Sequence, residues 1–392
     1  MSYDTDTPLA KKLKAIIGQS PSSGIVLDDD GKELAVPSIP FRKYMEACLY
    51  DSEFGYYRTG AARVGKGGDF YTSSAIGDIM GRLLAGCAHR YSQLHGQSIS
   101  IVEWGAGTGV LSAQIAAFCR ELDAKPWHRQ LLIENHSGHA AAAKAAMMAL
   151  ELSEPPFVLN TDALSSFGIR QWLNERPALL IANELLDAFP VSRIQRKDGQ
   201  LVELGVAILP DGSFVYSRMP LSDPRLAHWL KRDGVELREG QITEVCPGVN
   251  DWLAQLGNWC AGSTVRIAIL DYGHAAPEYA GEHRMEGTLM TYARHQGGDQ
   301  PFDRPGQRDI TAHVAFDFVK ACAEEAGFQA IYYDTQKRFL MDQGVLELLV
   351  EHDGRDPFSV GARRNRAVRQ LLLSDGMSES FKVMILEMNK TG

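Results

Sequence analysis

The stretch Ile101 to Ile115, IVEWGAGTGVLSAQI, decides the fold of this 392-residue chain. An apolar segment ends in Glu103, glycines follow at 105, 107 and 109, and apolar residues then recur at helical spacing. Glycines let a backbone turn sharply and approach a ligand without Cβ atoms in the way. The pattern therefore predicts a strand, a glycine loop and a helix, with the loop as a ligand site.

The spacing of Gly105, Gly107 and Gly109 indicates which ligand is favoured. A dinucleotide-binding loop would have its third glycine at position 110, which is valine here. Its pyrophosphate would also avoid a carboxylate such as Glu103, whereas S-adenosylmethionine (SAM) carries an ammonium and a sulfonium. The loop therefore favours SAM, and a tight turn that binds nothing is the alternative.

Two further acids follow predicted strands. Residues 130–133 form an apolar strand that ends in Glu134, which is placed to accept hydrogen bonds from ribose hydroxyls. A third strand, 157–160, is followed by Asp162, which is placed to hold the adenine amino group. Glu134 can instead be a solvated loop acid, and Asp162 can instead cap a short helix.

Strand and helix patterns alternate from residue 96 to about 195, which predicts an α/β fold with a doubly wound parallel sheet. The fourth strand is 178–182 and the fifth is 265–270, while two final strands cover 329–334 and 382–387. Residues 191–217 predict an inserted antiparallel meander with Asp-Gly turns. Residues 311–326 are expected to form one helix, and residues 1 to about 95 to form helices with a glycine-rich loop.

Composition excludes several functions. A formal net charge of -9 and a pI near 5.7 argue against broad nucleic-acid binding. The six cysteines form no C-x-x-C pair, so neither a metal site nor a disulfide framework is expected. No stretch approaches the roughly 20 apolar residues that span a bilayer, so no membrane insertion is expected. The N-terminus lacks the apolar core of a signal peptide, which predicts a cytoplasmic protein.

Several motifs, taken together and in order, resemble the MidA family of class I SAM-dependent methyltransferases. They are FGYY (54–57), GGDFYTSSAIG (67–77), EWGAGTG (103–109), ANELLDAFPV (182–191), DYGH (271–274), GTLMTYARH (287–295) and DITAHVAF (309–316). This family includes a mitochondrial complex I assembly factor that methylates an arginine of a complex I subunit. The resemblance implies a Rossmann-like sheet, mostly parallel with an antiparallel final strand, and SAM as the methyl donor.

The resemblance also implies a domain organisation. Residues 1–95 are expected to be an N-terminal helical region that closes over the SAM site as a lid. Residues 96–392 are expected to be the methyltransferase domain, with insertions at about 191–240 and 275–309. Within the lid, Gly68, Asp69 and Thr72 are expected to contact the donor, with Asp69 near its ammonium. A plain loop capped by Asp69 is the alternative.

The resemblance suggests a protein arginine as acceptor, possibly on a complex I subunit. A guanidinium is a permanent cation with donors only, so carboxylates must hold it. Glu184 and Asp187 follow the fourth strand at the ligand-binding edge of the sheet, and Asn183 can share their work or contact the donor. The alternative is that Asn183 or Asp187 only caps a short helix.

Other motif residues are assigned more modest roles. His313 is a candidate on the acceptor side, although a lone histidine is more often structural. Asp309 is expected to cap the helix that follows it, and Tyr57 is expected to pack in the core or lid. A small-molecule methyltransferase, or a SAM-binding assembly factor with little turnover, remains the alternative to a protein arginine methyltransferase.

Overall fold

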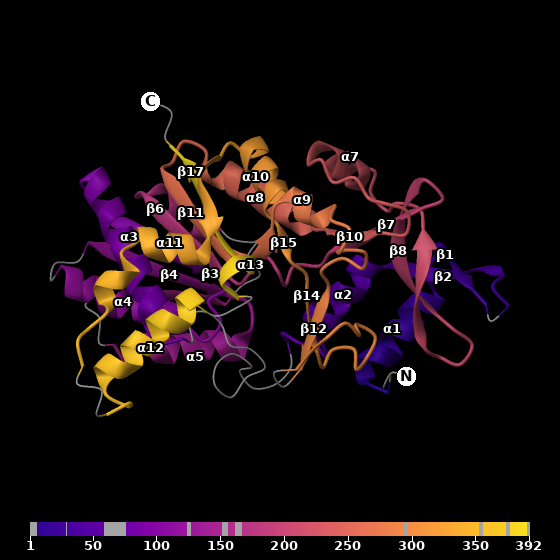
Figure 1. The fold of residues 1–392 in the computed structure, drawn as a ribbon, viewed down its shortest axis with the longest axis horizontal. Helices are drawn as coiled ribbons and strands as arrows, with labels where there is room; N and C mark the ends of the chain where they lie inside the picture. The colour runs from indigo at the N-terminus through magenta and orange to yellow at the C-terminus, as the bar shows by residue number, and fades with distance from the viewer. Residues whose placement is uncertain are drawn as a thin grey trace. The chain divides into compact units, whose positions relative to one another are not determined.

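The computed structural model describes residues 6–28, 30–58, 76–123, 127–150, 156–160, 167–293, 296–352, 356–373 and 377–389 (Figure 1). Its contacts divide the chain into two compact units. The first unit comprises Met1–Gly60, Leu186–Asp251 and His274–Ala321, and the second comprises Ala61–Leu185, Trp252–Gly273 and Cys322–Gly392. The first boundary in this division falls after Gly60 and not near residue 95. A second boundary falls after Leu185, so the segment before it belongs to the second unit and the segment after it belongs to the first.

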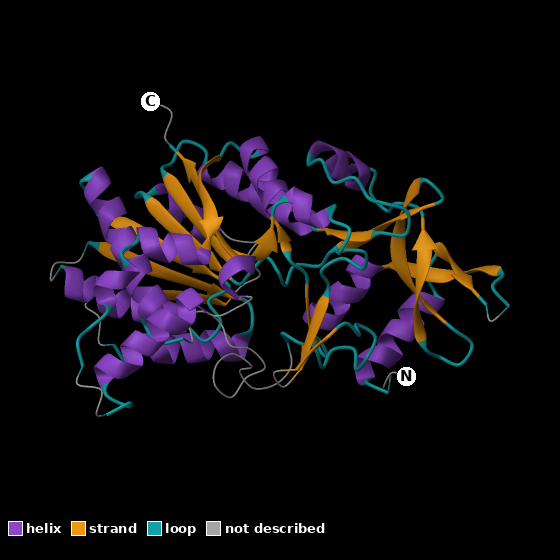
Figure 2. Cartoon of the chain, viewed as in Figure 1, coloured by secondary structure: helices purple, strands orange, loops and turns teal. Residues whose placement is uncertain are grey.

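The second unit contains the α/β sheet (Figure 2). Its strands follow the order β16-β17-β11-β6-β3-β4-β5. Their bounds are Gln329–Thr335 (β16), Phe381–Met388 (β17), Val265–His274 (β11), Ala178–Asn183 (β6), Ile99–Trp104 (β3), His128–Glu134 (β4) and Phe157–Asn160 (β5). Strands β11, β6, β3, β4 and β5 pair in parallel, whereas β17 pairs antiparallel with both of its neighbours. The mostly parallel sheet and its antiparallel final strand were therefore predicted correctly.

Helices cover the two faces of this sheet. Ile99 and Ile101 of β3 join a core with α3, α4, α11 and α12, and these helices lie along one side of the sheet in Figure 1. Trp104 belongs to the opposite face of the strand, and its ring lies 5.7 Å from that of Trp252 in α8. The helices of this unit are Ile79–His95 (α3), Val110–Leu122 (α4), Ser137–Met148 (α5), Phe167–Asn174 (α6), Gln336–Asp342 (α11), Val345–Leu348 (η2), Val360–Leu373 (α12) and Met377–Ser380 (α13). Two helices cross the unit boundary, Pro247–Cys260 (α8) and Phe316–Glu325 (α10).

The first unit is built on an antiparallel sheet of order β10-β7-β8-β2-β1-β9. Its strands are Ile242–Val245 (β10), Ser192–Lys197 (β7), Gln200–Ile208 (β8), Glu33–Pro40 (β2), Ser23–Leu27 (β1) and Phe214–Met219 (β9). Strand β9 also pairs with β8, so that β8, β2, β1 and β9 close on themselves. Strands β7, β8 and β9 therefore form one antiparallel sheet with the N-terminal strands β1 and β2. This sheet is separate from the α/β sheet of the second unit.

A smaller sheet and several helices complete the first unit. Strands Gln296–Gly298 (β13), Met290–Ala293 (β12) and Asp309–Thr311 (β14) pair antiparallel in the order β13-β12-β14. The remaining elements are Pro8–Gly18 (α1), Phe41–Tyr50 (α2), Arg225–Arg232 (α7), Ala276–Tyr279 (α9) and Val314–Ala315 (β15). Helix α1 begins as its sequence indicates, because Thr7 Oγ1 accepts a hydrogen bond from the Ala10 N–H and Pro8 is its first residue.

Two predicted elements are wrong. The N-terminal region is not all helical, because residues 23–40 form the β1–β2 hairpin through five register pairs. Residues 311–326 do not form one helix, because β14 and β15 precede α10, which begins only at Phe316. Branched residues such as Ile310, Thr311 and Val314 favour a strand, and this preference outweighs the helical spacing further along the segment.

In the described ranges, no helix has both the length and the apolar character that crossing a membrane requires. The same residues contain no cluster of three or more histidine, cysteine, aspartate or glutamate side chains suited to a metal ion.

Candidate functional site

The glycine loop follows β3 at the carboxyl edge of the sheet. Gly105, Gly107 and Gly109 all have positive φ angles, of 73°, 53° and 76°, a conformation that other residues rarely adopt. The loop is tied to the neighbouring strand, because the N–H groups of Gly105 and Ala106 both donate to the carbonyl of Ile133, at 2.9 and 3.1 Å. The three glycines are therefore required by the backbone itself.

The surroundings of the three glycines differ. A Cβ at Gly105 would lie 2.8 Å from Leu185 Cδ1, and a Cβ at Gly109 would lie 2.9 Å from the backbone of Ala143 in α5. These two glycines allow close packing within the protein. A Cβ at Gly107 would meet no atom of the described residues within 4 Å. Open space at Gly107 is the room that a ligand needs to approach the loop, so this position fits a SAM site.

Glu134 ends β4 beside the loop. Its Oε2 accepts a hydrogen bond from the Gly107 N–H at 2.8 Å, and its Oε1 accepts one from the His136 N–H at 2.8 Å. An ionised carboxylate only accepts hydrogen bonds, and the hydroxyls of a ribose are donors that suit it. The predicted ribose acceptor thus lies next to the predicted glycine loop.

Glu103 is oriented toward the protein interior. It belongs to the buried strand β3, and its carboxylate accepts a short hydrogen bond from the Ser112 hydroxyl of α4. Burial raises the pKa of Glu103 to about 7, and the charge of Glu134 adds to this shift. The described contacts of Glu103 therefore link β3 to α4.

Asn183 is the last residue of the central strand β6. The residue before it, Ala182, pairs with Trp104 of β3. Its Oδ1 is buried and accepts no hydrogen bond from any residue that the structure describes. A buried acceptor without a partner is costly, by roughly 1–3 kcal/mol. A bound ligand that donates a hydrogen bond to Asn183 Oδ1 would remove this cost, so this atom also fits a SAM site.

Glu184 follows with a φ of 50°, which is unusual for a residue that has a Cβ. Its N–H donates to the Leu270 carbonyl at 2.8 Å, and the next N–H, of Leu185, donates to Asp271 Oδ2 at 3.2 Å. Asp271 is fully buried and also accepts from the Tyr272 N–H at 2.8 Å. The DYGH motif thus supplies an acid that holds the turn after β6, a role that the sequence analysis did not assign.

Asp187 and His313 belong to the first unit. The carbonyl of Asp187 accepts a hydrogen bond from the Ala312 N–H at 3.0 Å, and desolvation by burial raises the pKa of its carboxyl to about 7. The His313 N–H donates to Thr288 Oγ1 at 3.1 Å, while its Nδ1 is buried and has no hydrogen-bond partner in the part of the chain that the structure describes. Burial lowers the pKa of His313 to about 4, so its ring is neutral at physiological pH.

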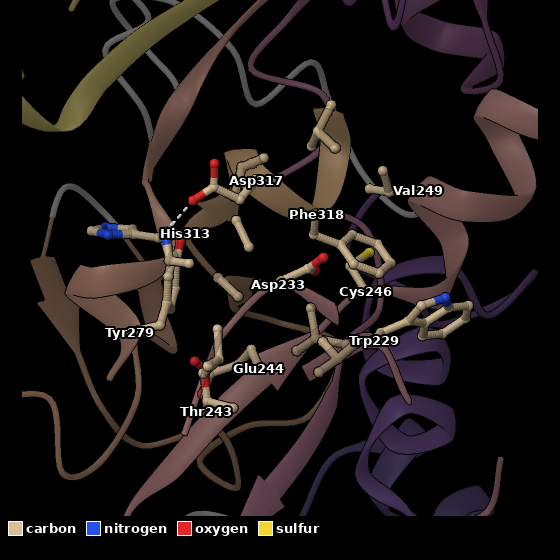
Figure 3. A pocket seen from close by; sticks show the side chains of 18 of the residues that line it. Trp229, Asp233, Thr243, Glu244, Cys246, Val249, Tyr279, His313, Asp317 and Phe318 are labelled. Carbon is tan, nitrogen blue, oxygen red and sulfur yellow. Dashed lines mark hydrogen bonds between the residues drawn. The ribbon is translucent and has the colours of Figure 1, made fainter. Parts of the chain in front are cut away.

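A pocket of about 40 Å³ lies inside the first unit (Figure 3). In this view Trp229 and Phe318 lie on one side of the pocket, with their rings 5.3 Å apart, and His313 and Tyr279 lie on the other. The space can hold about three water-sized groups. It is too small for a whole metabolite.

Four predicted site residues lie outside the described residues. They are Gly68, Asp69 and Thr72 of the expected lid and Asp162 of the expected adenine contact. The described residues bring together Glu134 and the glycine loop, and they place Asn183 and Glu184 at the end of the adjacent strand.

A sheet of this order with a glycine loop after β3 defines a SAM-dependent methyltransferase of class I fold. Residues 83–333 match the family described as "Putative S-adenosyl-L-methionine-dependent methyltransferase", and the chain belongs to this family. A protein from Burkholderia thailandensis, solved with bound S-adenosyl-homocysteine, shares 26% sequence identity and has a TM-score of 0.82. The match covers 100% of this chain and 96% of that one.

Mammalian proteins that are similar to this chain are also named as methyltransferases. The rat "Protein arginine methyltransferase NDUFAF7, mitochondrial" is 27% identical over 370 residues, which cover 89% of this chain and 80% of the relative. Its mouse counterpart is 28% identical over 340 residues, which cover 81% of this chain and 74% of the relative. These matches confirm the resemblance to the MidA family and the expected use of SAM.

One prediction is contradicted by the same relatives. The expected cytoplasmic location is wrong, because the matching proteins from rat, mouse and zebrafish are named as mitochondrial. The expectation rested on the scattered cysteines and on the lack of a signal-peptide core, and neither feature separates the cytosol from the mitochondrion.

Proposed function

We propose that this methyltransferase methylates the side chain of an arginine in a protein acceptor. The observation that carries the proposal is the set of relatives named protein arginine methyltransferase, which match up to 90% of this chain at 24–28% identity. Within that class of acceptor, a subunit of respiratory complex I is the first candidate, because the MidA resemblance suggests it.

SAM is held by the second unit in this proposal. The open space at Gly107 receives the donor, Glu134 accepts from its ribose hydroxyls, and the unpartnered Oδ1 of Asn183 accepts from a donor group of the ligand. Bound SAM supplies an activated methyl group: the acceptor nitrogen forms the new N–C bond, and the electron pair of the broken C–S bond stays on sulfur.

The acceptor places two demands on the protein. A guanidinium is protonated at physiological pH and must lose one proton as its nitrogen is methylated. It must also be held with one nitrogen facing the methyl group. We assign orientation to Glu184, whose strained backbone fixes its position after β6, and proton acceptance to Asp187. A pKa of about 7 lets Asp187 accept a proton at neutral pH.

The test is labelling of the acceptor. Purified enzyme and SAM with a labelled methyl group are incubated with lysate of a strain that lacks the enzyme, and the labelled product is hydrolysed and identified. Labelled methylarginine in a protein is expected, and the identity of that protein tests complex I as the target. A labelled small metabolite, or SAM binding without any transfer, would overturn the proposal.

A further inference from the structure

Four separated sequence motifs converge in the first unit. Tyr57 of FGYY, Asp187 of ANELLDAFPV, Tyr292 of GTLMTYARH and Asp309 of DITAHVAF belong to this unit and are linked by contacts described below. Helix α2 is in contact with β14, which pairs with β12 (Figure 1). Of these four residues, only Asp187 has a role in the proposed function.

Asp309 does not cap a helix, which corrects its expected role. It lies in strand β14 and is only 1% exposed. Its Oδ2 accepts a hydrogen bond from the Tyr57 hydroxyl at 2.7 Å, and its Oδ1 accepts from the Ile310 N–H at 2.9 Å. A buried carboxylate is costly unless it is paired, and these neutral donors hold it in a fixed orientation.

Tyr292 and Tyr57 surround this carboxylate with aromatic rings. Tyr292 is directly opposite Asp309 in the antiparallel pairing of β12 and β14, so the two side chains share one face. The ring of Tyr57 stacks on that of Tyr50, with centroids 5.6 Å apart. Burial and the nearby charges of Asp309 and Asp187 raise the pKa of Tyr57, so its hydroxyl remains a donor.

Two further hydrogen bonds hold the segment that carries Asp187. The Tyr50 hydroxyl donates to the carbonyl of Ala188 at 2.9 Å. From the other side, the Ala312 N–H, three residues beyond Asp309, donates to the Asp187 carbonyl at 3.0 Å. Burial raises the pKa of Tyr292, as it does that of Tyr57, and the charge of Asp187 adds to the shift of both tyrosines. Asp187 and Asp309 therefore lie in one environment of tyrosine rings.

Such an environment matches the chemistry of a guanidinium. This cation is planar, stacks on aromatic faces and offers paired donors to carboxylates. An ammonium is a compact charge that needs no flat aromatic surface. We propose that Asp309 binds the acceptor guanidinium together with Asp187, and that Tyr57 is a positioning residue that orients Asp309. This inference rests on the proposed arginine methyltransferase function and names further residues of its acceptor site.

The test compares Tyr57→Phe and Asp309→Asn with Tyr44→Phe as a matched control. Tyr44 is also a buried tyrosine of the first unit, and its hydroxyl donates to the Pro301 carbonyl at 2.9 Å. Each Tyr→Phe variant loses the hydrogen bond of its hydroxyl, part-buried for Tyr57 and buried for Tyr44, so the melting temperature should fall no more for Tyr57→Phe than for Tyr44→Phe. Methylarginine formation is measured with labelled SAM against increasing amounts of lysate protein from the deletion strain.

Tyr57→Phe should raise the half-saturating amount of lysate protein about tenfold, and Asp309→Asn should lower the rate about a hundredfold or more. Tyr44→Phe should match the wild type in both, and all three variants should bind S-adenosyl-homocysteine normally by calorimetry. Wild-type kinetics in folded Tyr57→Phe would overturn the inference even where Asp309→Asn fails to fold. Absence of methylarginine with the wild-type enzyme would instead overturn the proposed function on which the inference rests.

Discussion

The Gly107 N–H donates a hydrogen bond to the Glu134 carboxylate at 2.8 Å, which joins the glycine loop after β3 to the acid that ends β4. The other oxygen of Glu134, Oε1, accepts a hydrogen bond from the His136 N–H. The bond fixes the carboxylate beside the open space at Gly107. Two predictions depend on this relationship.

Gly107→Ala should weaken binding of S-adenosyl-homocysteine at least tenfold, because its Cβ would occupy the space that the ligand needs. The positive φ adds backbone strain of roughly 1–3 kcal/mol. Gly199→Ala is the matched control, since Gly199 has a φ of 73° and an added Cβ would meet no described atom within 4 Å, but it lies in the β7–β8 turn. Calorimetry should show unchanged affinity for Gly199→Ala, and equal affinities for both variants would contradict the site.

Glu134→Gln should weaken binding of S-adenosyl-homocysteine about 10- to 100-fold, because a hydrogen bond to a charged group contributes roughly 1.5–3 kcal/mol. Glutamine retains one acceptor oxygen and replaces the other with a donor that faces a backbone N–H. Glu121→Gln is the control, since Glu121 is an exposed acid of the same unit that pairs with Arg82 at 3.1 Å. An affinity within twofold of wild type for Glu134→Gln would remove Glu134 from the site.

Much of the second unit could be predicted from local sequence. Strands of a parallel sheet are buried on both faces, so β3, β6 and the first part of β11 appear as mostly apolar runs. The loop could be predicted because the spacing of Gly105, Gly107 and Gly109 reflects a backbone requirement, which the positive φ angles confirm.

The first unit was harder because its organisation depends on distant pairings. The β1–β2 hairpin finds its partner in β8, more than 150 residues further along the chain, through pairs such as Ile39 with Val206. The roles of Asp271 and Asp309 are similarly distant, since one holds the turn after β6 and the other accepts from Tyr57. Sequence motifs marked these acids, but only the fold assigns their partners.

Glu184→Gln should lower methyl transfer about a hundredfold, the equivalent of about 2.7 kcal/mol of transition-state stabilisation, with SAM affinity preserved. Glu184→Gly should lose at least as much activity yet be no less stable than wild type, because glycine adopts a φ of 50° without strain. Rates and unfolding free energies of both variants are compared. An active Glu184→Gly enzyme would show that only the turn matters.

The buried Glu103 should make the folded protein less stable as pH rises. Its folded pKa of about 7 lies above its unfolded value near 4.5, so the folded state holds the proton more tightly. This stabilisation is complete below about pH 4.5 and is lost as pH rises through 7, a change of about 3 kcal/mol. Urea unfolding at pH 5 and pH 8 should give a smaller difference for Glu103→Gln than for wild type, and identical differences would contradict the burial of a titrating Glu103.

The pH dependence of catalysis tests Asp187 as the proton acceptor. Its pKa is raised from 3.8 to about 7 by burial, and only the ionised form accepts a proton, so kcat/KM should rise about tenfold per pH unit below 7 and level off above about 8. Asp187→Asn should be at least a hundredfold slower and should lose this acid limb, because asparagine does not titrate. Glu103 titrates in the same range, so Glu103→Gln is the necessary control and should retain the limb. If the limb persists in Asp187→Asn and disappears in Glu103→Gln, the proton acceptor is not Asp187.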